Sequence, residues 1–184
     1  CALHFQKENT IDNITSTILF GDGCAAVLMQ NNSNEKGISI NNFFSQVAFK
    51  GKADMAWNLS AKGFLMTLSG YVPNLVEQDF DNLVNKALQN SLLDKSEITH
   101  WCIHPGGKKI LEAIEKSILL PQGSLAHSYN VLKDYGNMSS PTILFVLQNI
   151  FDELKGQREN NKAKIFGAAF GPGLTMETFI ASYD

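Results

Sequence analysis

The sequence has few cysteines, little net charge and no long apolar run. Its 184 residues include three cysteines, none close to another, which favours a reducing compartment over a disulfide framework. The 15 basic and 18 acidic residues give a formal charge of −3, and this scattered charge gives no sign of a nucleic-acid surface. No apolar run approaches the roughly 20 residues that a membrane helix needs. We therefore expect a cytoplasmic protein without nucleic-acid or membrane partners.

The start of the chain lacks the features of a leader sequence. Residues 1–4 have no basic start and no long apolar run follows them, so they do not resemble a signal peptide. They also lack an initiator Met, and we expect the chain to come from a longer protein. With 44% apolar residues, 184 positions suffice for one hydrophobic core.

Hydrophobic periodicity predicts strands that alternate with long helices. Residues 17–28 have the pattern of a strand, a Gly-Asp-Gly turn and a second strand, and residues 57–71 suggest a strand end and a loop. Further strands are predicted at 37–50, 99–103, 165–170 and 174–181, helices at 72–91, 107–119 and 139–154, and polar loops at 31–36 and 156–163. This order is typical of α/β layers, in which the apolar stripes of the helices at 72–91 and 139–154 cover a mixed sheet.

The first candidate functional residue is His104, in the segment Trp-Cys-Ile-His-Pro-Gly-Gly at 101–107. It stands where a strand is expected to end and a helix to begin, which is where ligands bind in open α/β sheets. Gly106 and Gly107 leave the backbone open to a substrate, and the free N–H groups of the helix start favour a carbonyl oxygen or an anion. Taken alone, His104 is equally well explained as an incidental residue of a turn.

The second candidate is Asn137, in the segment Gly-Asn-Met-Ser-Ser at 136–140. Alone, it is better explained as the N-cap of the next helix. The two residues together favour a different interpretation, because a His and an Asn that meet in one pocket can both donate to an oxygen that gains negative charge. We therefore predict that the two side chains converge on one cavity.

These motifs, with Phe-Gly-Pro-Gly-Leu at 170–174, resemble the C-terminal half of the type III polyketide synthases, the chalcone-synthase-like enzymes. Ala169 stands where that family usually has the first glycine of its Gly-Phe-Gly-Pro-Gly loop. The resemblance covers nearly the whole chain but only about half of a synthase. It implies a thiolase-like α/β/α fold, with residues 1–35 as the end of the N-terminal half and residues 36–184 as the C-terminal domain.

The resemblance also implies roles for single residues. His104 and Asn137 would complete a Cys-His-Asn triad that decarboxylates malonyl-CoA and condenses the enolate with an acyl group taken from an acyl-CoA starter. It implies a homodimer that needs no cofactor or metal, with coenzyme A thioesters as substrates. Further residues align with the substrate pocket (Met66, Ser139, Phe170, Gly171, Pro172, Gly173) and with the coenzyme A site (Gly107, Lys108, Lys109). For Met66, plain core packing is a slightly better interpretation than a gate.

The nucleophile of the triad is not expected in this chain. Cys1, Cys24 and Cys102 do not align with it, and all three are predicted to be buried, unreactive thiols. We therefore expect the chain alone to be inactive and the full-length protein to be an acyltransferase. Two alternatives stay open: a condensing enzyme like ketoacyl-acyl-carrier-protein synthase III, and a non-catalytic fragment with the thiolase fold.

Overall fold

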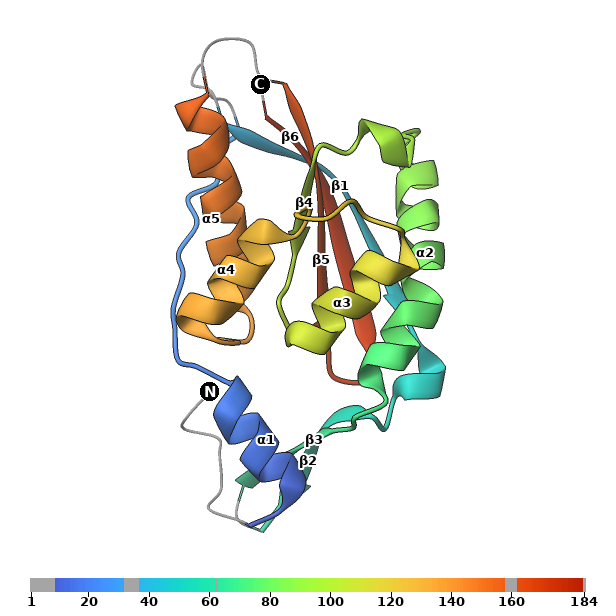
Figure 1. Cartoon of the computed structure of the whole chain (residues 1–184), viewed down its shortest axis with the longest axis vertical. Coiled ribbons are helices and arrows are strands. Elements are labelled where there is room, and N and C mark those ends of the chain that lie inside the picture. The colour runs from blue at the N-terminus through green and yellow to red at the C-terminus, as the bar shows by residue number, and fades with distance from the viewer. Residues whose placement is uncertain (1–8, 32–36, 62, 158–161, 184) are drawn as a thin grey trace.

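The computed structural model describes residues 9–31, 37–61, 63–157 and 162–183. Its centre is a four-stranded mixed sheet (Figure 1) in the order β1-β6-β5-β4. β6 pairs antiparallel with both β1 and β5, and β5 pairs parallel with β4. The bounds of these strands are β1 (Ile38–Val47), β4 (His100–Ile103), β5 (Ala163–Gly171) and β6 (Thr175–Tyr183). The predicted hairpin through the Gly-Pro-Gly turn is confirmed as β5 and β6.

Helices cover both faces of the sheet, which makes three layers. In Figure 1, α2 (Val72–Asn90) and α3 (Lys108–Ser117) lie on one side of the sheet, and α4 (Ala126–Tyr135) and α5 (Pro141–Gly156) lie on the other. Short 3-10 turns at Phe49–Gly51 and Lys95–Glu97 join elements at the rim. The predicted packing of the two long helices against a sheet is therefore confirmed.

The two cores follow from the alternation of side chains along the strands. On β4, Trp101 and Ile103 join the core under α2 and α3, whereas Cys102 between them joins the core under α5. On β5, Ile165 and Phe166 divide in the same way. The stripe of α2 predicted from its 3.6-residue period is buried on the sheet, including Val76, Phe80, Leu83 and Val84. Burial of both sheet faces explains why β4 and β5 are almost wholly apolar.

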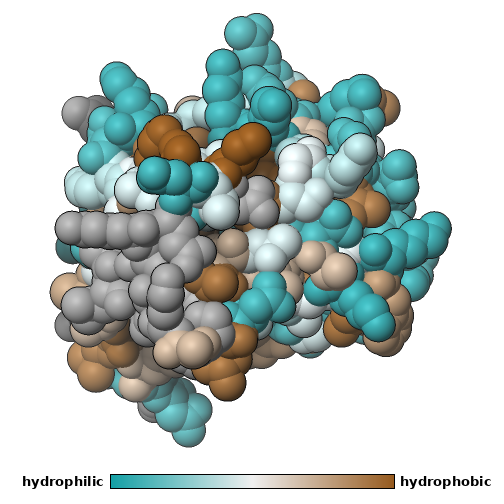
Figure 2. All heavy atoms as spheres, turned by 90° about the horizontal axis from the view of Figure 1, so that it is seen from below, coloured by the Kyte–Doolittle hydropathy of each residue, from teal (hydrophilic) through white to brown (hydrophobic). Residues whose placement is uncertain are grey.

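A smaller unit closes one end of the molecule. α1 (Ile11–Leu19) packs on a hairpin of β2 (Met55–Ser60) and β3 (Gly63–Leu68), below the sheet in Figure 1. Figure 2 views the molecule from this end and shows apolar side chains at the surface between polar ones. Ile11 and Ile18 of α1 and Leu59 of β2 are each at least 80% exposed, so this unit offers apolar surface to solvent.

The predicted pair of strands at 17–28 is wrong. α1 ends at Leu19, and residues 21–30 form no strand. Phe20 instead makes an isolated parallel bridge with Asn137, so this backbone pairs with a loop rather than with the sheet. Cys24, predicted to be buried, is exposed for the same reason.

Two helices, α1 and α4, were not predicted from the sequence. α1 has a Thr10 N-cap whose side chain accepts from the Asn13 N–H, but the strand interpretation of its last residues hid it. In α4 only Val131 is a fully buried apolar residue, while Tyr129 and Leu132 are partly buried against the core, so its sequence shows little of the apolar stripe that predicts a helix. The loop prediction at 31–36 falls mostly outside the described residues, as do residues 158–161 of the loop predicted at 156–163. Of the rest of that second loop, Gly156 ends α5 and Ala163 begins β5. The boundary at residues 35 and 36 stays a prediction. Within the described residues, no helix has the length and apolar character to cross a membrane.

Candidate functional site

His104 is held at the end of β4, where the sheet opens toward α3. Its backbone N–H donates to the Ala168 carbonyl of β5 at 2.8 Å, which continues the parallel pairing by one residue. The side chain is 7% exposed. Burial lowers the pKa of His104 from 6.5 to about 4, because the buried imidazolium would lose its hydration. The ring is therefore neutral near pH 7 and keeps one N–H donor and one acceptor nitrogen.

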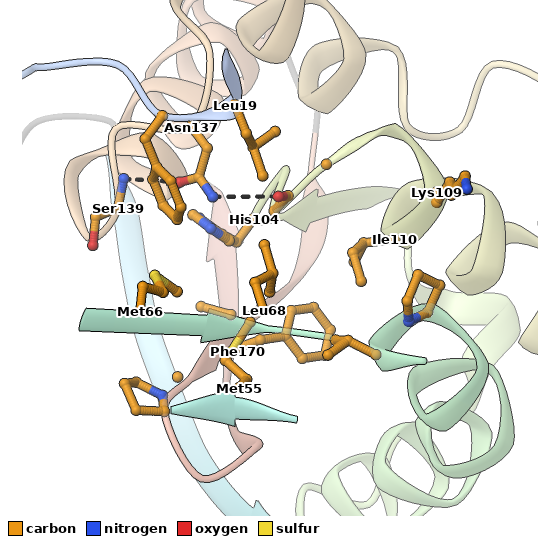
Figure 3. Close-up of a pocket in the computed structure, with 18 of the residues that line it drawn as sticks. Leu19, Met55, Met66, Leu68, His104, Lys109, Ile110, Asn137, Ser139 and Phe170 are labelled. Atoms are coloured by element: carbon orange, nitrogen blue, oxygen red, sulfur yellow. Dashed lines mark hydrogen bonds between the residues drawn. The ribbon is translucent and has the colours of Figure 1, made fainter. Parts of the chain in front are cut away.

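Asn137 is fixed by hydrogen bonds to both its backbone and its side chain. Its Oδ1 accepts the Ser139 N–H at 2.8 Å, and its Nδ2 donates to the Gly106 carbonyl at 3.3 Å (Figure 3). The first bond orients the amide, and the second ties it to the loop that carries His104. An amide nitrogen has two hydrogens, so a second donor is left for a ligand. The N-cap explanation is not what the structure shows, since Ser140 stands directly before α5.

The loop from residue 136 to 139 has an uncommon backbone. Gly136 and Ser139 have φ angles of 70° and 66°, in the left-handed region that only glycine adopts freely. At Ser139 this conformation is held by the bond from its N–H to Asn137 Oδ1. Strained residues of this kind collect at functional sites, and Ser139 lies in the wall of the cavity described next.

His104 and Asn137 line one cavity of about 640 Å³. This confirms the predicted convergence of two residues that are 33 positions apart in the chain. In Figure 3 both lie on one side of the cavity, and Met66, Leu68 and Phe170 lie on the other. The remaining walls are mostly apolar, with a few hydroxyl groups and two lysines at one end. Such a space suits an apolar substrate with one polar reacting group.

Most of the other residues singled out from the sequence also line this cavity. These are Met66, Ser139, Phe170, Gly171 and Pro172 of the predicted pocket, and Gly107, Lys108 and Lys109 of the predicted coenzyme A site. Gly173 does not line it: its φ is 77°, and its N–H donates to the Met55 carbonyl at 2.7 Å. Gly173 thus ties the β5–β6 turn to the β2–β3 hairpin.

Several lining residues gave no signal in the sequence. Thr15, Leu19 and Phe20 come from α1 and the residue after it, and Met55 and Trp57 come from β2. These elements reach the cavity only because the small unit folds against the end of the sheet. The segment 17–28 was interpreted as a hairpin, so its contribution to the cavity was missed.

Neither described cysteine lines the cavity. Cys102 is wholly buried on the α5 side of the sheet, where its Sγ contacts the Ile143 carbonyl at 3.6 Å. Burial raises the pKa of the Cys102 thiol far above its ordinary value, which removes it as a nucleophile. Cys1 lies outside the described residues. The part of the chain that the structure describes also holds no group of His, Cys, Asp and Glu suited to a metal ion.

Comparison with known proteins places this chain in a family. The family model of the chalcone and stilbene synthases, C-terminal domain, matches residues 40–182. The chain belongs to this family. A chalcone synthase-like protein of Bacillus subtilis is 32% identical to it over 192 aligned positions, covering all of this chain and 52% of the relative. The alpha-pyrone synthesis polyketide synthase-like Pks18 of Mycobacterium tuberculosis is 29% identical, covering 96% of this chain and 46% of the relative.

Solved structures agree with the family. The 1,3,6,8-tetrahydroxynaphthalene synthase of Streptomyces coelicolor A3(2), a bacterial type III polyketide synthase, superposes with a TM-score of 0.90 at 25% identity. The match covers 52% of that structure's chain and 100% of this chain. PKS-I of the brown alga Ectocarpus siliculosus gives a TM-score of 0.84 at 23% identity over 50% of its length, which supports the fold alone. The fold is thus thiolase-like, and the chain spans about half the length of the curated relatives it matches.

Proposed function

We propose that the chain supplies the His and Asn of a Cys-His-Asn triad in a type III polyketide synthase. The observation that carries this proposal is the convergence of His104 and Asn137 on one largely apolar cavity, in a chain of the chalcone and stilbene synthase family. The cysteine would come from a part of the protein outside this chain, because neither described cysteine reaches the cavity.

In the proposed reaction both residues act on the thioester oxygen of malonyl-CoA. The bond from the α-carbon to the carboxylate breaks, carbon dioxide leaves, and the electron pair passes into an enolate whose charge lies on that oxygen. The neutral ring of His104 and the second Nδ2 hydrogen of Asn137 are preplaced donors for this charge. The enolate carbon then attacks the acyl-cysteine carbonyl, and the cysteine thiolate leaves.

The neutral state of His104 has a consequence for the cysteine. With a pKa of about 4, the ring does not ionise a neighbouring thiol on its own. A thiolate placed beside the ring would raise this pKa, because an anion favours the imidazolium. An ion pair between the two residues would therefore form only with the thiolate beside the ring.

The coenzyme A arm is proposed to enter at the start of α3. Lys109 lines the cavity at the end away from Asn137 (Figure 3), and Lys108 lines it too while pairing with Glu112 at 3.6 Å. Two cations beside the N-terminus of a helix favour phosphate groups. The proposal needs no cofactor beyond the coenzyme A substrates. The homodimer and the acyl-CoA starter rest on the family resemblance.

The proposal is tested by malonyl-CoA decarboxylation and polyketide formation in the full-length protein. His104→Ala and Asn137→Ala should each lower kcat by about 10²–10³-fold, the usual loss of one oxyanion donor. Matched controls are His127→Ala and Asn85→Ala, since neither residue lines the cavity. Variants at 104 and 137 that match these controls would overturn the proposal. A full-length protein without decarboxylation would favour the non-catalytic alternative.

A further inference from the structure

The segment Gly21-Asp22-Gly23 is not used by the proposed mechanism, yet it contacts the loop that carries Asn137. We refer to residues 19–23 as the glycine strap. From these contacts we infer that Gly21 and Gly23 are positioning residues that hold the Asn137 loop against the cavity. The inference rests on the proposed function, because it assigns the strap a purpose in the reaction of Asn137.

The strap provides hydrogen-bond partners for the backbone N–H and carbonyl of Asn137. The Asn137 N–H donates to the Leu19 carbonyl at 3.0 Å, and the Gly21 N–H donates to the Asn137 carbonyl at 2.8 Å. These two bonds form the parallel bridge between Phe20 and Asn137. The strap thus pairs with both the N–H and the carbonyl of Asn137. The Asn137 side chain bonds elsewhere, to the Ser139 N–H and the Gly106 carbonyl. The strap thus sets the position of the backbone from which the amide projects.

Gly21 and Gly23 lie where there is no room for a Cβ atom. A Cβ built on Gly21 would stand 2.5 Å from the Tyr135 carbonyl oxygen, and one built on Gly23 would overlap the Met138 side chain. Real Cβ atoms do not approach other heavy atoms so closely. Gly136 faces the strap from the other side: its own Cβ would lie 3.2 Å from the Leu19 carbonyl oxygen. The strap therefore packs against the loop backbone before Asn137 and against the Met138 side chain after it.

A side chain at Gly21 must push the loop away from the strap, and one at Gly23 must displace the Met138 side chain. At Gly21 the obstacle is a backbone atom, so the loop itself has to move. At Gly23 the obstacle is a flexible side chain, so the displacement is smaller and the fold is easier to keep. Because Asn137 lies between the two points of contact, either displacement moves its amide relative to His104. A misplacement of about 1 Å can cost about 10²-fold in rate.

The first test compares kcat and KM for malonyl-CoA decarboxylation in the full-length protein. Gly21→Ala and Gly23→Ala should lower kcat by about 10–100-fold, with a small change in the KM for malonyl-CoA. Gly37→Ala and Gly156→Ala are matched controls, because a Cβ at either position meets no atom within 4 Å. If the strap variants match these controls, or if activity falls only in proportion to the folded fraction, the inference is wrong.

The second test asks whether the effect passes through Asn137. In an Asn137→Ala background, Gly23→Ala should lower kcat by less than about twofold, since residues that act as a unit are non-additive. Met138→Ala should also restore most of the kcat lost in Gly23→Ala, by removing the atoms that the new Cβ meets. Losses that multiply, or no restoration, would contradict the inference even if Gly21→Ala fails to fold. If Asn137→Ala itself had no effect, the proposed function would fail instead.

Discussion

At the scale of single residues, the site depends on a histidine that is kept neutral by burial. His104 is 7% exposed, and burial is the cause of its lowered pKa of about 4. A neutral ring keeps an N–H donor near pH 7. The same burial makes protonation of His104 costly to the folded state.

This cost predicts a pH dependence of stability. Between pH 6.5 and 4 the unfolded chain binds a proton at His104 and the folded chain does not, so the free energy of unfolding falls as the pH falls through this window. The shift corresponds to about 3 kcal/mol, which is fully lost only below pH 4. Urea unfolding at pH 7 and pH 4.5 measures it. His104→Gln should flatten the decline, and an unchanged decline would show that other groups cause it.

The cavity residues that lie beside Pro and Gly were the part of the wall that the sequence predicted best. His104, Gly107 and Asn137 each lie beside a Pro or Gly residue near a helix boundary, and all three line the cavity. Trp57 and the residues of α1 have no such mark. Their place in the wall depends on how the small unit packs, which local periodicity does not contain.

At the scale of elements, the start of α5 fixes the loop before it through a buried threonine. Thr142 has no exposed surface, its Oγ1 accepts the Met138 N–H at 2.9 Å, and it donates to the Ser139 carbonyl at 2.7 Å. One hydroxyl thus satisfies two backbone groups beside Asn137. The loop is therefore held from α5 as well as from the strap.

Removing this hydroxyl should destabilise the protein. Thr142→Val keeps the shape of the side chain but leaves the buried Met138 N–H without its partner, at a cost of about 1–3 kcal/mol. Thr142→Ser keeps the hydroxyl and should cost less. Chemical denaturation of both variants measures the difference. A serine variant as unstable as the valine variant would show that packing of the methyl group, and not the hydrogen bonds, is what matters.

Elements that bury one face were predicted well, and elements that bury little were not. The stripe of α2 and the hairpin of β5 and β6 follow from strong periodicity and from Gly-Pro-Gly, and both are observed. Residues 21–30 contain the small and β-branched residues typical of a strand. Strand hydrogen bonds need a neighbouring strand, and residues 21–30 belong to neither of the sheets in the described part of the chain.

At the scale of the whole molecule, the cavity lies where the sheet, the start of α3, the Asn137 loop and the small unit meet. Each contributes a different property: the sheet end places His104, the loop places Asn137, and the small unit closes the apolar wall with Met55, Trp57 and Met66. The thiolase-like layers were predicted through the family resemblance. The closure by α1 was not, because it depends on contacts between segments far apart in the sequence.

The central claim is that His104 and Asn137 act together on one oxygen, and a double-mutant cycle on kcat for malonyl-CoA decarboxylation in the full-length protein tests it most directly. The cycle compares His104→Ala, Asn137→Ala and the double variant with the unmodified protein. Residues that stabilise the same charge are strongly non-additive, so the double variant should lose little more activity than the more damaged single variant. Losses that multiply would mean that the two residues act independently, and would contradict the account.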